Sequence, residues 1–315
     1  MSVEHVRAFN ERRVGSERLY LLLDPLTEHH GENSLAPAAL HRSLPDGALT
    51  TVRRQDLAHT PALCPLLVDI GSLSADSGDA LLVKSSVYAS GEDGRSRRYV
   101  AGWLISALDG EGLAEHLASM CRMKDAAGGS HFFPMHEPLR IELLAVADRG
   151  YARQQLGPIR EWLLPASSGG VVLMTGKNDT NGALPVPPVA LQAQQEAQRV
   201  AMVLSAWRAV TRRKTGGAPW SGKSIEQRPA NAARDALVQI RTATNQLRLR
   251  KNDDIVTFAV HSLVRHPKIH QDLLIAGLID RASKGEEALI DLFTEVHEAR
   301  WTYIVSSLLN ARTAQ

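Results

Sequence analysis

Short apolar runs, each bounded by proline, glycine or aspartate, recur along the first half of the chain. Residues 19–23 (LYLLL) end at Asp24-Pro25, residues 63–70 (LCPLLVDI) stop at Gly71, and residues 100–108 (VAGWLISAL) lead into an Asp-Gly-Glu-Gly turn. Continuous apolar runs of this length predict buried strands. Weaker patterns predict strands over residues 80–88, 131–135 and 171–174. Apolar positions at helical spacing predict helices over 37–44 and 113–123, a helix that begins at Pro138, and one helical turn over 159–163.

The period of the pattern changes after a segment rich in proline. Residues 181–190 (NGALPVPPVA) contain three prolines and form the clearest linker in the chain. Beyond it, apolar positions recur three and four residues apart, which predicts helices over residues 191–213 and 233–247, then over 255–263, 269–276 and 289–309. No β pattern appears in this half.

These patterns together predict an α+β protein with two domains. We expect an α/β lobe over residues 1–180, with a small mixed sheet and flanking helices. The linker over 181–190 then leads into an all-α lobe over 191–315. A length of 315 residues suits about two domains, and 44% hydrophobic residues suffice for two cores.

Charge and composition limit the kinds of molecule that the protein can be expected to bind and the compartment in which it can be expected to lie. The formal net charge is +2, from 36 basic and 34 acidic side chains, which argues against a dedicated nucleic-acid-binding protein. No apolar stretch approaches the ~20 residues that span a bilayer. The charged N-terminus lacks a signal peptide, and Cys64 and Cys121 have the spacing of neither a metal site nor a disulfide framework. We therefore expect a cytoplasmic protein without membrane contact.

One motif points to nucleotide chemistry. Residues 217–224 (GAPWSGKS) match the phosphate-binding loop G-x-x-x-x-G-K-[ST] through Gly217, Gly222, Lys223 and Ser224. Such a loop needs a buried strand before it and a helix after it. Here the preceding residues end a polar, amphipathic helix, and Pro229 follows closely. We interpret the match as a decoy in a basic loop between helices.

Other candidate chemistry is sparse. The histidines show no H-E-x-x-H spacing and the serines no G-x-S-x-G motif, so we expect neither a metal site nor a catalytic residue, and no cofactor. The pair His29-His30 fits a polar loop. Two tryptophans are candidates for contact with a partner protein, because aromatic side chains dominate interface hot spots. Trp220 in the loop either anchors a partner or covers the helical lobe, and Trp207 is the second candidate.

Six segments carry a resemblance to a known family. They are LYLLLDP at 19–25, LCPLLVDIG at 63–71, GWLIS at 102–106, the helix that ends near Met123, FFPMHEPLR at 132–140 and LGPIREWL at 156–163. In this order they resemble the adaptor and chaperone family of the type VI secretion system, over about residues 18–175. The chain departs from the family pattern where Glu137-Pro138 replaces Asp-Pro and where Pro134 replaces an arginine.

The resemblance implies a role and a set of partners. Members bind a specific effector protein before its secretion and help to load it onto the spike protein of the injection apparatus, without catalysis or cofactor. We therefore expect a non-enzymatic adaptor with a secreted effector and the spike as partners. The alternative is a nucleotide-binding switch or enzyme that uses the loop Gly217–Ser224, and a weaker one is a nucleic-acid-binding helical lobe with Arg248, Arg250 and Lys251.

Overall fold

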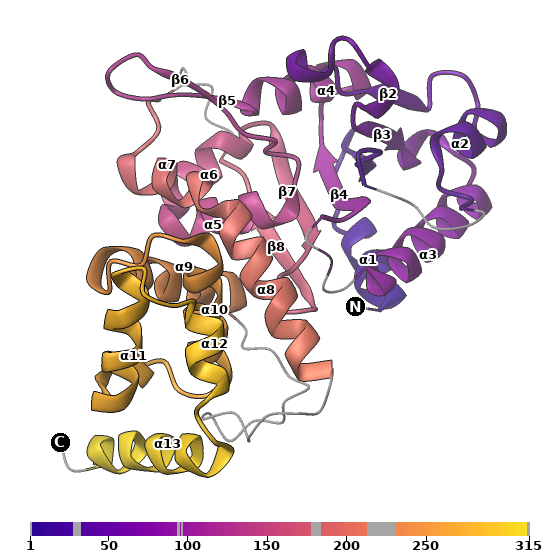
Figure 1. The fold of residues 1–315 in the computed structure, drawn as a ribbon. Helices are drawn as coiled ribbons and strands as arrows, with labels where there is room; N and C mark the ends of the chain where they lie inside the picture. Colours follow the sequence, from indigo (N-terminus) through magenta and orange to yellow (C-terminus); the bar gives the residue numbers. More distant parts are fainter. Residues whose placement is uncertain are drawn as a thin grey trace. The chain divides into compact units, whose positions relative to one another are not determined.

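The apolar runs of the first half form the strands of a six-stranded sheet in the computed structural model of the chain (Figure 1). The strands lie in the order β2-β3-β1-β4-β7-β8, and every pairing described between them is antiparallel. Their bounds are β1 Arg18–Leu23, β2 Leu49–Thr51, β3 Leu66–Asp69, β4 Val100–Ser106, β7 Ile159–Pro165 and β8 Val171–Thr175. A hairpin of β5 (Arg122–Lys124) and β6 (Ser130–Phe132) stands apart from this sheet.

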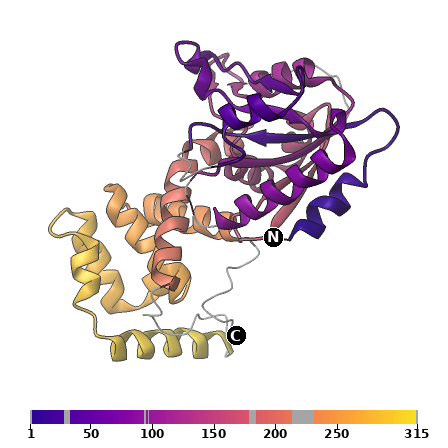
Figure 2. The same ribbon diagram turned by 90° about the vertical axis from the view of Figure 1, so that its right-hand side faces the viewer.

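Helices cover both faces of the sheet. They are α1 Val3–Asn10, α2 Pro37–Ser43, α3 Ala75–Gly91, α4 Gly110–Met120, α5 Pro138–Ala147, α6 Arg149–Leu156 and α7 Pro188–Gln195, with 3-10 turns at Gln55–Leu57, Pro61–Leu63 and Ile70–Ser72. Figure 2 shows α3 lying across the strands. The structure describes residues 2–27, 33–92, 95, 97–177, 184–212 and 231–313.

Two cores sandwich the sheet and explain its sequence pattern. Leu19, Leu21 and Trp103 point to the core shared with α1 and α3, whereas Tyr20 and Leu22 point to the core shared with α4, α5 and α6. Because both faces are buried, both sets of alternate side chains must be apolar. This is why β1, β3 and β4 read as continuous apolar runs.

The single helices predicted over residues 191–213 and 289–309 are each divided in two, and two stretches of the first half were assigned the wrong kind of element. Residues 80–88 lie within α3, whose buried face consists largely of small and polar residues such as Gly78, Ser85 and Ser86. Such a face gives no helical apolar stripe, although Trp103 Nε1 donates to Ser85 Oγ across it at 3.0 Å. Residues 159–163 lie in β7, where burial on both faces produced an apolar spacing that imitates a helix.

Gly102 allows the centre of the sheet to pack closely. Its φ of 134° lies outside the range that other residues adopt readily, and the register of β4 against β1 shifts beside it. A Cβ atom at this position would lie 2.6 Å from both Leu163 O and Trp162 Nε1. The glycine therefore makes room for the indole of Trp162, whose Nε1 donates to Ala101 O at 3.3 Å.

The second half is helical throughout the residues that the structure describes. Its helices are α8 Ala197–Arg212, α9 Ala232–Arg241, α10 Asn252–Val264, α11 Leu273–Ser283, α12 Leu289–Thr294 and α13 Glu298–Thr313, with a π turn at Thr242–Gln246 and a 3-10 turn at Ile269–Gln271. Helix α10 packs against α8, α9 and α12. His261 of α10 contacts Phe293 and Trp301 edge-on or tilted, with ring centroids 4.8 and 5.3 Å away. Aromatic rings thus tie α12 and α13 to α10.

The α+β fold class is confirmed, with a sheet that is antiparallel where a mixed one was expected. The chain divides into two compact units, Met1–Gln195 and Glu196–Gln315. Helix α7 packs against α5 and belongs to the first unit, although the sequence assigned residues 191–195 to the helical lobe. Of the described helices, none combines the length and apolar character needed to cross a bilayer.

Candidate functional site

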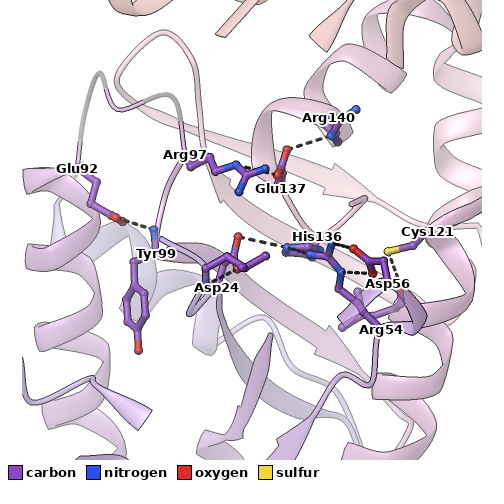
Figure 3. Close-up of polar contacts among 12 residues, drawn as sticks. Asp24, Arg54, Asp56, Glu92, Arg97, Tyr99, Cys121, His136, Glu137 and Arg140 are labelled. Atoms are coloured by element: carbon purple, nitrogen blue, oxygen red, sulfur yellow. Dashed lines mark hydrogen bonds and ion pairs between the residues drawn. The ribbon is translucent and has the colours of Figure 1, made fainter. Parts of the chain in front are cut away.

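Asp24 and His136 meet in the interior of the first unit, although they lie far apart in the sequence (Figure 3). Asp24 directly follows β1, and its backbone N–H donates to Tyr99 O at 2.7 Å while its Oδ1 accepts a hydrogen bond from Leu26 N at 3.1 Å. His136 lies in the short connection between β6 and α5. Its Nε2 lies 3.3 Å from Asp24 Oδ2, and both side chains are buried. The contact joins the first strand of the unit to the start of α5.

The buried pair holds opposite charges. Burial by itself would lower the pKa of His136, but the bond to the Asp24 carboxylate and the neighbouring Cys121 sulfur together raise it to about 9. Burial likewise acts to raise the pKa of Asp24, and the bond from His136 overcomes it, so that this pKa is lowered. An ionised carboxylate only accepts hydrogen bonds, so we assign the proton at Nε2 as donated to Asp24. His136 is therefore an imidazolium at neutral pH.

Arg54 completes the charge balance of the cluster. It is buried, and its Nε and Nη2 donate to Asp56 at 3.1 and 2.5 Å in a bidentate pair. Its Nη1 lies 3.3 Å from His136 Nε2, which is a packing contact because that nitrogen already carries a proton. Two carboxylates, one guanidinium and one imidazolium sum to zero. Asp24, Arg54 and His136 are buried, whereas Asp56 lies at the exposed edge of the cluster, and the four charges balance without an excess of either sign.

Cys121 adds a thiol to this neighbourhood. It follows α4, is buried, and donates from Sγ to Leu117 O at 3.5 Å. Cysteine, histidine and aspartate are the residue types of a nucleophile, its base and an orienting acid. Here all three side chains are at most 2% exposed, and the contact from Asp24 occupies His136 Nε2. Among the described residues the three side chains are enclosed, and the contacts of the cluster hold strands and loops together.

A second set of polar contacts connects this region to α7. Glu137 accepts a hydrogen bond from Arg140 Nε at 2.9 Å and lies 3.5 Å from Arg97 Nε. Arg140 in turn donates to Gln194 O at 3.1 Å, and Gln194 Nε2 donates back to Arg140 O at 2.9 Å. Glu137, which stands where the resembled family has aspartate, therefore helps to fasten α5 to the last helix of the unit.

The residues singled out from the sequence lie elsewhere or outside the described part. The loop Gly217–Ser224 with Trp220, and the pair His29-His30, are not among the described residues. The residues that lead toward the loop form helix α8, whereas a phosphate-binding loop follows a strand. Trp207 is 6% exposed within the helical unit, which leaves little of its ring for a partner to contact. In the described ranges, no three His, Cys, Asp or Glu side chains converge as metal ligands would.

The buried cluster was not found from the sequence, although its members lie in segments noted there. Asp24 lies in LYLLLDP, and His136 lies in FFPMHEPLR. The sequence signal was the occurrence of both residues within family-like segments, but nothing in either segment shows that they pair. No family model, no curated protein and no solved structure matches the chain. The resemblance of these segments therefore remains a prediction from the sequence.

Proposed function

We propose that this protein is a non-enzymatic adaptor that binds a cognate effector of the type VI secretion system in the cytoplasm and promotes its loading onto the spike protein. The observation that carries the proposal is the contact between Asp24 and His136. It joins two of the segments on which the resemblance rests, LYLLLDP and FFPMHEPLR, through a buried ion pair. Segments that resemble a family in order along the chain are thus neighbours in space.

The chemistry of the cluster favours a binding role over catalysis. The groups able to act as nucleophile, base or acid, namely Cys121, His136 and Asp24, are buried, and the two charged ones pair with each other through Nε2 of His136. Catalysis on a substrate requires such groups to reach it within hydrogen-bond distance. Burial of this kind instead fixes loops and leaves the surface of the unit to bind a protein.

The helical unit exposes apolar side chains that suit contact with a polypeptide. Leu273 at the start of α11 is 91% exposed, Ile290 of α12 is 58% exposed and Tyr303 of α13 is 62% exposed. Large apolar groups left in water are often found where another protein binds. We expect an effector to cover part of this surface.

Secretion by the native bacterium tests the proposal. The gene is deleted, and the effector encoded beside it is measured in the medium and in cells by immunoblot. We expect secretion of that effector to fall at least about tenfold while a second, unrelated effector is secreted as before. Restoring the gene, with or without Lys223→Ala, is expected to restore secretion. Unchanged secretion in the deletion strain would exclude the adaptor role.

The alternative of a nucleotide-dependent switch is tested in the same experiment. The Lys223→Ala change removes the side chain that a phosphate-binding loop requires. Failure of only this variant to restore secretion, together with ATP or GTP binding by the parent protein in calorimetry, would favour the switch. We expect the parent protein to bind neither nucleotide.

A further inference from the structure

One edge of the sheet presents an unused row of backbone hydrogen-bonding groups. Strand β2 is the outermost strand at its end of the sheet and pairs only with β3 among the described residues. At the two ends of this pairing, Asp69 N of β3 donates to Ala48 O at 2.9 Å, and Val52 N donates to Pro65 O, just before β3, at 2.8 Å. Bonded and non-bonded positions alternate in an antiparallel ladder, so the N–H and C=O groups of Leu49 and Thr51 point away from β3. An added strand would find these groups in the geometry that it needs.

A groove runs along this edge with a helix as its other wall. Its volume is about 710 Å³, and β2 lines one side of it. The opposite side comes from α4, through Glu111, Ala114, Glu115 and Ala118, which share one helical face by their spacing. The two alanines leave room beside the strand. Gly110 lets the helix begin against β2, because a Cβ there would lie 2.5 Å from Thr50 Oγ1.

The charges in the groove favour a basic occupant. Glu111 and Glu115 of α4 are exposed and form no ion pair with other described residues, and Asp109 is used only to cap the helix by accepting from Gly112 N at 2.9 Å. Arg53 contributes one positive charge to the lining of the groove. The remaining charges, Arg18 and Asp69, pair with each other at 2.9 Å. The lining of the groove therefore carries an excess of two negative charges, and the acidic side chains Asp109, Glu111 and Glu115 all lie along α4.

We propose that an extended, basic segment of the effector adds to β2 as a further antiparallel or parallel strand in this groove. The open backbone groups select a strand, since a helix has no free N–H and C=O groups along its side. Alternate side chains of the added strand face α4, where Glu111 and Glu115 select lysine or arginine. The other side chains lie on the face of Leu49, which packs against the apolar core of α3, and are apolar. This inference deepens the proposed function and rests on it for the identity of the partner.

A labelled Lys-Val peptide is the probe for the groove. Fluorescein-KVKVKV is titrated with the full-length protein and its anisotropy measured, with EVEVEV as the charge control. Two further KVKVKV peptides carry N-methyl groups on every lysine or on every valine. Alternate N–H groups of a strand point to opposite edges. We expect the unmethylated peptide and one methylated peptide to bind, and the other methylated peptide and EVEVEV to bind at least about tenfold more weakly.

A pair of matched variants places the binding at the groove. Glu115→Lys reverses a charge on the wall formed by α4, whereas Glu295→Lys makes the same change at an exposed residue after α12. We expect at least about tenfold weaker peptide binding for the first variant and unchanged binding for the second. The amide signals of Leu49 and Thr51 in an NMR titration should shift with the parent protein. Absence of peptide binding, equal binding of both methylated peptides, or equal binding to both variants would overturn the proposal.

The effector itself separates this inference from the proposed function. Purified effector is titrated against the parent protein, Glu115→Lys and Glu295→Lys. Weaker binding to Glu115→Lys alone supports the groove as the effector site. Equal binding to all three proteins would leave the adaptor role standing and overturn the assignment of the groove, whereas no binding to the parent protein would overturn both.

Discussion

The buried pair of Asp24 and His136 predicts an unusual dependence of stability on pH for the first unit. The pKa of His136 is raised from 6.5 to about 9 because the Asp24 carboxylate holds its proton. The folded unit then binds this proton more tightly than the unfolded chain does. The stabilisation is complete below pH 6.5 and is lost as the pH rises through 9. A difference of this size corresponds to about 3 kcal/mol between pH 6 and pH 9.

Replacement of His136 by glutamine should remove this dependence. We expect His136→Gln to be less stable than the parent protein by about 3 kcal/mol at pH 6, with a difference that narrows toward pH 9. Asp24→Asn removes the larger of the two contributions that raise the pKa of His136, so it should reduce the dependence of stability on pH. His59→Gln, which changes an exposed histidine of the same unit, should keep the slope of the parent protein.

Urea unfolding at pH 6, 7.5 and 9 measures these free energies. The two units can unfold separately, so amide hydrogen exchange in peptides from β1 and β4, corrected for the intrinsic effect of pH, reports on the first unit alone. An equal free energy of unfolding for the parent protein at pH 6 and pH 9 would refute the assignment of a charged His136. If the free energy of unfolding of His136→Gln changes with pH as much as that of the parent protein, other groups cause the dependence on pH.

Three further predictions concern single positions in the two units. Gly102→Ala should lower the free energy of unfolding by more than about 2 kcal/mol, because a Cβ would lie 2.6 Å from two atoms at a φ of 134°. Gly91→Ala, at a position with open space around it, should change the urea midpoint little, and equal midpoints for the two variants would exclude the close packing at Gly102. Arg248→Gly should stabilise the helical unit by about 1 kcal/mol, since Arg248 has a φ of 57°; a lower midpoint would contradict this. Burial lowers the pKa of His261 to about 4, so the free energy of unfolding of the helical unit should fall by up to about 3 kcal/mol as the pH falls from 6.5 to 4. His261→Phe should remove this dependence on pH, and a variant that keeps the dependence of the parent protein would show that other groups cause it.

The strands that could be predicted from the sequence are those that are buried on both faces. In β1, β3 and β4 both faces are covered, so an apolar run bounded by a proline, glycine or aspartate has one interpretation. Helix α3 was missed because its buried face uses serine and glycine, which allow close packing and a hydrogen bond from Trp103. Strand β7 was missed because the apolar positions Ile159, Trp162 and Leu163 on either side of Arg160 and Glu161 also satisfy helical spacing. Secondary structure was predicted wrongly from the local apolar pattern where close packing, and not the period of the helix or strand, determined the residue types.

The interior cluster could not be predicted for a different reason. Asp24, Arg54, Cys121 and His136 come from four separate segments of the chain, and each has an ordinary local context. A histidine with no spacing to another ligand is usually taken as a surface or core residue. Only the three-dimensional register of β1 beside β4, with α5 over the same face, brings Asp24 to His136. The same holds for the groove, since the free side of β2 follows from the strand order.

The central claim is that this protein binds another protein and needs no nucleotide to do so. Isothermal titration of the purified full-length chain with the purified effector encoded beside it, in buffer free of ATP and GTP, tests this claim directly. We predict saturable binding with a Kd below about 1 μM that added nucleotide leaves unchanged. Binding that appears only after addition of ATP or GTP, or no binding in either buffer, would contradict the claim.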